Sequence, residues 1–188
     1  DYTPEYYINF FEACNRLVKK NGRIGMLVPR SFMFLKSFQE FREDFIGGRG
    51  SFDFLAEFGI GILDNATVRT AGTVVRSDTK NSGSGTFIRL DDVEQSQKEH
   101  SFLHSAFVDD VESGVRRLYR RDPPEFSLVP GTPLSYWVPK ELRILYDSPH
   151  VLDKKRSGKN QDGLGDLRQG IATGNDSRFL RTFWESPD

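Results

Sequence analysis

The sequence predicts an α/β fold built on a doubly wound sheet, and two observations carry this prediction. Residues 21–33 (NGRIGMLVPRSFM) combine a helix end, a short buried strand and a polar turn that leads into another helix. This order of elements is typical of doubly wound sheets, in which ligands bind beyond the carboxyl ends of the strands. Residues 52–58 and 67–76 are two further strand-like runs joined by a loop, which predicts an antiparallel pair.

A helix over residues 4–20 and a strand over residues 24–28 begin the predicted fold. Thr3-Pro4 is a typical helix start, and apolar residues then recur three and four positions apart. Pro29 ends the strand, because proline cannot donate to a central ladder. On spacing alone, the turn after Pro29 could be an ordinary connection rather than a site.

A second helix is expected over residues 32–46, with Ser31 as its N-cap. Its phenylalanines recur at helical spacing, which indicates a stripe that faces the core. Gly47-Gly48 then stops this helix. Beyond the antiparallel pair, residues 86–90 predict one more strand at the edge of the sheet.

The second half of the chain is more polar. Residues 91–119 are weakly helical and heavily charged, and a short helix is expected over residues 139–147. The proline density of residues 121–132 indicates a domain boundary. A basic cluster could contact phosphate, although a solvated surface is the simpler interpretation. Its members are Arg116, Arg117, Arg120 and Arg121.

The composition of the 188 residues excludes several classes of protein. A formal net charge of −1 means that any basic surface for nucleic acid would have to be local. The single cysteine, Cys14, cannot form an internal disulfide and favours a reducing, cytoplasmic setting. No apolar run reaches membrane length and no signal peptide is present, so no membrane partner is expected. His100 and His104 have helical spacing but lack the glutamate of the metalloprotease motif, so we expect no metal site.

Two stretches resemble methyltransferase motifs and depart from them. Residues 57–61 (EFGIG) resemble the Gly-rich turn that cradles S-adenosylmethionine, but a strand follows where that turn needs a helix. Residues 122–126 (DPPEF) resemble the Asp/Asn-Pro-Pro-aromatic motif of amino-group methyltransferases. Glu125 occupies the position of the aromatic residue that would stack on a flipped base. We therefore interpret the first stretch as an ordinary turn and the second as a linker.

The order of the elements resembles a known family. Residues 1–33 resemble the segment that follows the catalytic motif in adenine-N6 DNA methyltransferases, including type IIG restriction–modification enzymes. Residues 133–148 (PLSYWVPKELRILYDS) and 168–185 (RQGIATGNDSRFLRTFWE) resemble one branch in particular. That branch is the large adenine-specific methyltransferases of bacteriophage-exclusion (BREX) systems.

The resemblance implies a more specific fold. Residues 1–121 would form the C-terminal half of a Rossmann-like S-adenosylmethionine-dependent methyltransferase sheet, with a parallel strand and an antiparallel edge pair. Residues 122–188 would form a linker and the start of an α+β target-recognition region. The family's Gly-rich cofactor loop and its Asn-Pro-Pro-Tyr motif lie upstream of the segment that matches. Because this chain has neither in valid form, and begins at Asp1 without methionine, we expect a fragment that is inactive alone.

The resemblance also implies partners and site residues. The full-length enzyme would use S-adenosylmethionine as cofactor and double-stranded DNA as substrate, and this chain would join the missing N-terminal half. Other phage-defence proteins are candidate partners. The rim of the adenine pocket would comprise Pro29, Arg30, Ser31, Leu63 and Asn65. Residues whose side chains can read or contact DNA beside glycines are Arg168, Gln169, Thr173, Asn175 and Arg178.

Leu63 marks a departure, because the family often places an aromatic residue before the last strand to hold the flipped adenine. Two other functions remain open. The chain could be a non-catalytic DNA- or protein-binding module, which predicts salt-dependent DNA binding without cofactor binding. It could also be a complete small methyltransferase that uses the two departing motifs, which predicts saturable binding of S-adenosylmethionine.

Overall fold

The structure is a computed structural model that describes residues 6–44, 50–63, 67–77, 83–108, 111–112 and 114–147. The chain divides into two compact units, residues 1–148 and 149–188, and all of the described residues belong to the first. This unit combines helices with a mixed five-stranded sheet, which confirms the α/β class. No helix among the described residues is long and apolar enough to cross a membrane.

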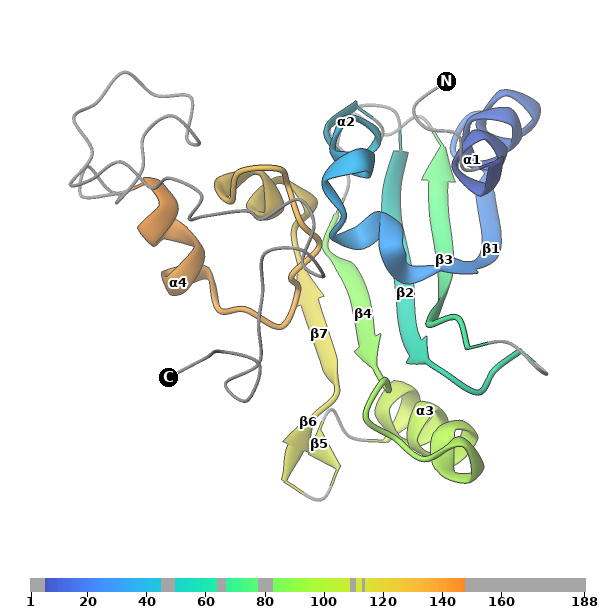
Figure 1. Ribbon diagram of the computed structural model, residues 1–188, viewed down its shortest axis with the longest axis vertical. Coiled ribbons are helices and arrows are strands. Elements are labelled where there is room, and N and C mark those ends of the chain that lie inside the picture. The colour runs from blue at the N-terminus through green and yellow to red at the C-terminus, as the bar shows by residue number, and fades with distance from the viewer. Residues whose placement is uncertain are drawn as a thin grey trace, which may run out of the picture. The chain divides into compact units, whose positions relative to one another are not determined.

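The five strands lie side by side in the order β1-β3-β2-β4-β7 (Figure 1). β3 is antiparallel to both β1 and β2, whereas β2 and β4 are parallel, and β7 is antiparallel to β4. A separate two-stranded ribbon pairs β5 with β6. The bounds are β1 Arg23–Pro29, β2 Gly50–Gly59, β3 Thr70–Ser77, β4 Gly85–Arg89, β5 Val111–Glu112, β6 Val115–Arg116 and β7 Leu118–Arg121.

Two predictions about the strands have different outcomes. The antiparallel pair is confirmed, because β2 and β3 are antiparallel and adjacent. The expected edge position of residues 86–90 is wrong, since β4 lies between β2 and β7. The reason is that LYRR at 118–121, inside the stretch expected to be weakly helical, forms β7 and covers the outer side of β4.

The first predicted helix is confirmed as α1 (Tyr6–Leu17). The single helix expected over residues 32–46 is wrong, because the described residues of this stretch form separate short helical pieces. Among these are η1 (Arg30–Met33), η2 (Lys36–Phe38) and α2 (Gln39–Phe41). Leu35 is extended, with φ −64° and ψ 142°, and this breaks the helix.

The buried side chain of Arg42 explains the break. Its Nη1 donates to the carbonyl oxygens of Phe32 and Leu35, each at 2.8 Å, and the Leu35 carbonyl also accepts from the amide of Phe38 at 3.1 Å. The same guanidinium donates to the carbonyls of Gly131 and Thr132, from a distant part of the chain. Burial lowers the pKa of Arg42 to about 10.

The remaining helices are α3 (Lys98–Phe107), which follows η4 (Gln95–Gln97), and α4 (Lys140–Ile144). α4 continues as η6 (Leu145–Asp147), which confirms the short helix expected over residues 139–147. Between β7 and α4 the chain also forms η5 (Pro123–Leu128).

The core has two parts, one on each face of the sheet. Aromatic side chains dominate the larger part, where the rings of Phe32 and Phe52 stack at 6.1 Å and Phe11 contacts Phe32 and Phe41. Burying each of these side chains contributes about 1.5–3 kcal/mol. The smaller part joins strands β2 and β4 to α3, and its buried members are Ala56, Ile88 and Leu90.

The segment after β7 packs on the same sheet. The ring of Tyr136 stacks on Phe87 of β4 at 5.0 Å, and Phe126 contacts Phe87 edge-on at 5.6 Å. Arg121 Nε donates to the carbonyl of Tyr136 at 2.8 Å. These contacts make residues 122–147 part of the first compact unit. The division between residues 121 and 122 stays a prediction.

Candidate functional site

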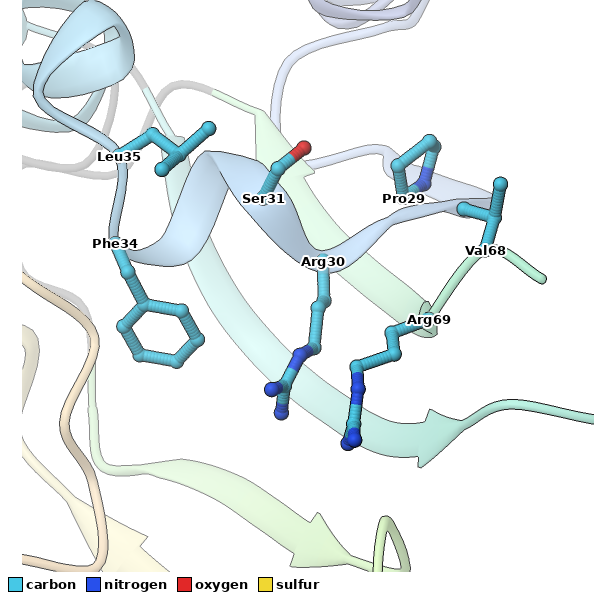
Figure 2. Close-up of a pocket in the computed structure, with 7 residues that line it drawn as sticks. All are labelled: Pro29, Arg30, Ser31, Phe34, Leu35, Val68 and Arg69. Carbon is cyan, nitrogen blue, oxygen red and sulfur yellow. The ribbon is translucent and has the colours of Figure 1, made fainter. Parts of the chain in front are cut away.

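An open pocket of about 360 Å³ lies where β1 ends and β3 begins (Figure 2). Three residues of the predicted adenine-pocket rim, Pro29, Arg30 and Ser31, line it together, although their role stays a prediction. Leu63 is exposed and does not line this pocket. The full lining comprises Pro29, Arg30, Ser31, Phe34, Leu35, Val68 and Arg69.

The remaining predicted site residues cannot be compared with the pocket. Asn65 lies outside the described residues. So do the five residues expected to contact DNA, which are Arg168, Gln169, Thr173, Asn175 and Arg178.

Strand pairing builds the pocket. β1 and β3 pair up to Pro29 and Thr70, and the amide of Arg30 then donates to the carbonyl of Arg69 at 2.9 Å. The chain turns into η1 directly afterwards, which brings Phe34 to the pocket wall. Ser31 is not the expected N-cap: no side chain caps η1, and its hydroxyl instead pairs with the Tyr7 hydroxyl at 2.9 Å. The pocket therefore lies at the carboxyl end of β1, where doubly wound sheets bind ligands.

A buried carboxylate holds one of the pocket arginines. Arg30 forms an ion pair with Glu57 of β2, whose side chain is fully buried. The second Glu57 oxygen accepts a hydrogen bond from the Tyr136 hydroxyl at 2.7 Å. Burial raises the pKa of Tyr136, so its hydroxyl stays protonated and acts as the donor. A buried carboxylate needs such partners, and the ion pair with Glu57 holds the Arg30 guanidinium in place.

Asp91 forms the second acidic centre of the site. Its carboxylate accepts from Arg89 Nε at 2.9 Å and from Arg30 Nη1 at 3.4 Å, and Arg69 Nη1 lies 3.7 Å away. Burial acts to raise the pKa of Asp91, but the hydrogen bond and charge of Arg89, followed by Arg30, lower it below its usual value. With Glu57, two carboxylates thus face three guanidinium groups.

Aromatic rings support the pocket wall. The Arg30 guanidinium lies 5.7 Å from the ring centroid of Phe34, and Phe34 meets Trp137 edge-on at 5.7 Å. The Arg89 guanidinium covers Trp137 at 4.7 Å. Trp137 comes from the segment after β7 and does not line the pocket, but it packs behind Phe34, which does.

The two stretches that depart from methyltransferase motifs have structural contacts. At residues 57–61 the strand ends in a turn in which Gly59 has φ 72°, and a Cβ there would lie 2.8 Å from the Cα of Asp91. Lys98 Nζ also donates to the carbonyl of Phe58 at 2.6 Å. In residues 122–126, Phe126 is buried in the core and Glu125 accepts from Arg143 at 3.0 Å. Residues 57–61 thus end β2 in a tight turn, and residues 122–126 pack against the sheet in η5 rather than forming a free linker.

The other candidate clusters are also accounted for. In the basic cluster, Arg117 pairs with Asp92 at 2.8 Å and Arg121 bonds a backbone carbonyl, which favours a surface role. The rings of His100 and His104 lie 6.1 Å apart on α3. Across the described part of the chain, no group of three or more His, Cys, Asp or Glu side chains could hold a metal ion.

Sequence reasoning missed several residues of the site. Phe34 was placed in a core stripe, and Arg69 was placed within a strand. The register of the β1–β3 pair brings Arg69 beside Arg30, and the two strands are far apart in the sequence. No local signal points to Glu57 or Asp91 as partners of these arginines.

Comparison with known proteins finds no matching family model but does find relatives. The chain is 28% identical over 183 residues to the adenine-specific methyltransferase PglX of Lacticaseibacillus casei (strain Zhang), covering 94% of this chain and 14% of that protein. It is 22% identical over 142 residues to the adenine-specific methyltransferase BrxX of Escherichia coli O9:H4 (strain HS), covering 73% of this chain and 11% of that protein.

Two solved structures show weaker likeness. The M protein of the type I restriction enzyme EcoKI has a TM-score of 0.40 and 15% identity, over 45% of this chain and 19% of that one. The type IIG restriction endonuclease BpuSI has a TM-score of 0.43 and 14% identity, over 63% of this chain and 14% of that one.

The sequence relation to PglX extends over nearly the whole chain, whereas the chain spans only 14% of PglX and 11% of BrxX. The expected resemblance to adenine-specific methyltransferases of the BREX type is thereby confirmed. This chain is a distant homologue of a segment of the adenine-specific methyltransferases PglX and BrxX.

Proposed function

We propose that the chain is part of a site-specific adenine-N6 DNA methyltransferase that acts in phage defence or restriction–modification. The observation that carries this proposal is the relation to PglX, which covers 94% of the chain. The pocket at the carboxyl end of β1 supports it, because three residues implied by the family resemblance line that pocket together. The reaction would transfer a methyl group from S-adenosylmethionine to adenine in double-stranded DNA.

In this proposal the described sheet is the C-terminal half of the methyltransferase sheet. Residues 1–121 would belong to that half, and residues 122–188 would form a linker and begin the target-recognition region. Pro29, Arg30 and Ser31 would form the rim of the adenine pocket with Leu63 and Asn65. Glu57 and Asp91 would then act as positioning residues that hold Arg30. The predicted DNA contacts are Arg168, Gln169, Thr173, Asn175 and Arg178.

The described residues do not fit the cofactor. The Gly-rich turn at residues 57–61 leads to β3 as the next described element rather than to a helix, and its Gly59 packs closely against Asp91. We therefore assign no residue of this chain to cofactor binding. The missing N-terminal half would hold the cofactor, and the chain alone would be inactive.

A chimera tests this function. In PglX of L. casei, the segment that matches this chain is replaced by the 188 residues, and the protein is expressed in a host without adenine methylation. Mass spectrometry of the genomic DNA then measures N6-methyladenine. We expect methylation from the chimera and none from PglX with the segment deleted. A folded chimera that is expressed like intact PglX but methylates no DNA would contradict the proposal.

Calorimetry on the chain itself tests the missing cofactor site. We expect no heat of binding when S-adenosylhomocysteine is titrated into the folded chain. Micromolar binding would overturn the assignment of the cofactor to a missing half and favour a complete small methyltransferase. If the chimera is inactive while the chain binds DNA, the non-catalytic binding module becomes the better function.

A further inference from the structure

We propose that Arg69 binds a backbone phosphate of DNA beside the nucleotide that enters the pocket. This inference rests on the proposed function, since it takes DNA as the ligand. It adds a contact that the family resemblance did not suggest, in the part of the chain that the structure describes.

Arg69 is held more loosely than the other arginines of the site. Among the three guanidinium groups around Asp91, Arg30 also pairs with buried Glu57, and Arg89 makes a 2.9 Å hydrogen bond. Arg69 lies 3.7 Å from Asp91, beyond normal hydrogen-bond distance, and its side chain is 45% exposed. Since two carboxylates face three arginines, the cation with the weakest compensation is Arg69.

Arg69 also lies where a nucleotide phosphate could reach it. Figure 2 shows the Arg30 and Arg69 side chains next to each other, with both guanidinium ends pointing the same way from the pocket. Pro29, Leu35 and Val68 supply apolar lining to the same pocket. An apolar hollow with a guanidinium at its edge matches a nucleotide, whose base and sugar are less polar than its phosphate. Arginine suits that phosphate, because its planar fork can donate two hydrogen bonds to it.

Arg23 provides a contrast to Arg69. Arg23 is more exposed, at 63% of its side chain, but its Nε donates to Asp53 at 2.8 Å and it does not line the pocket. Both arginines lie on the β1–β3 pair, Arg23 at the start of β1 and Arg69 beside its end. Arg23 is therefore a matched control for the loss of one exposed positive charge.

The test measures DNA binding as a function of salt. Fluorescence anisotropy of a short labelled duplex is recorded with the full chain and with Arg69→Ala, Arg69→Lys and Arg23→Ala, from about 50 to 200 mM salt. We expect Arg69→Ala to weaken binding by about three- to tenfold and to reduce the slope of log K against log salt by about 0.9. Arg69→Lys should keep the slope, because it keeps the charge, and Arg23→Ala should bind like the unchanged chain.

The outcomes separate this inference from the function on which it rests. An unchanged salt slope in Arg69→Ala, with its melting temperature also unchanged, would overturn the inference. An equal loss in Arg23→Ala would overturn it too, because any positive charge would then suffice. If the chain binds no duplex while the PglX chimera methylates DNA, the inference fails and the proposed function stands. If both binding and methylation are absent, both are wrong.

Discussion

The two ends of the sheet each gather arginines around a carboxylate, and the two clusters differ in burial and in hydrogen bonding. At the start of β1, Asp53 of β2 pairs with Arg23 and Arg76, so that one side chain ties three adjacent strands together. At the end of β1, buried Glu57 and partly buried Asp91 share the arginines that surround an open pocket. Composition alone would not tell these clusters apart.

The difference lies in what each carboxylate leaves for a ligand. Asp53 receives hydrogen bonds from both of its arginines, and Figure 2 does not include either arginine among the residues of the pocket. At the other end, buried Glu57 forms an ion pair with Arg30. Arg69 has only Asp91 as a partner carboxylate among these two, at 3.7 Å. We infer that the cluster around Asp53 only stabilises strand pairing, and that the cluster around Glu57 and Asp91 both stabilises the sheet and binds a ligand. The predictions below test this contrast.

The largest expected effect is at Glu57. Glu57→Ala removes the acceptor of both Arg30 and the Tyr136 hydroxyl in a fully buried place, so we expect it to lower the free energy of unfolding by about 3–5 kcal/mol. Asp53→Ala acts on exposed Arg23 and half-buried Arg76 near the surface and should cost about 0–1 kcal/mol. Urea unfolding followed by circular dichroism measures both values. Equal losses would show that the two ends of the sheet do not differ in burial of charge.

Tyr136→Phe should show the next largest effect. It removes a single hydrogen bond to a buried charged oxygen, and we expect a loss of about 1.5–3 kcal/mol in the free energy of unfolding. Tyr119→Phe is the matched control, because the Tyr119 hydroxyl donates to an exposed backbone carbonyl and should matter much less. If both variants unfold at the same urea concentration, Tyr136 does not support the buried acid.

Local signals explain which elements the sequence could predict. The helix α1, the strands β1 to β3 and the helix α4 each follow from apolar spacing and from Pro or Gly stop signals within a few residues. The helix expected over residues 32–46 does not form as one piece, because contacts with a distant segment favour the break. Arg42 binds the carbonyls of Gly131 and Thr132 and those at the break itself, and nothing in residues 32–46 encodes that partner.

The same distinction applies to the site. Pro29 to Ser31 were predicted together because the end of a strand is a local feature, and they line one pocket, although their role stays a prediction. Phe34 and Arg69 were missed because they reach the pocket through a broken helix and through strand register. β7 was missed because four residues in a charged stretch carry too little periodicity to indicate a strand.

Acid should affect both ends of the sheet in the same direction. Burial acts to raise the pKa of Asp53, but hydrogen bonds from Arg76 and then Arg23 lower it, and the pKa of Asp91 is lowered likewise. A lowered pKa in the folded state gives stability that is complete above the unfolded pKa of about 4 and is lost as pH falls through the folded pKa.

We therefore expect Asp53→Asn and Asp91→Asn each to reduce the acid sensitivity of the chain. The measurement is the urea midpoint at neutral pH and at about pH 3. Each variant should lose less stability between the two values than the unchanged chain does. A variant with the full acid loss would show that its aspartate is not the group that titrates.

Substitution of Arg69 or Arg23 should have the smallest effect on stability. These two variants nevertheless test most directly whether the two arginine clusters differ in function. We expect both alanine variants to change the free energy of unfolding by about 0–1 kcal/mol, since exposed ion pairs contribute little. Arg23→Ala should cost the more of the two, because Arg23 makes a 2.8 Å hydrogen bond whereas Arg69 lies 3.7 Å from its carboxylate. In DNA binding the order should reverse, with the loss at Arg69. Urea unfolding and duplex titration on the same two variants measure this reversal, and the same order in both assays would contradict a binding role that is special to Arg69.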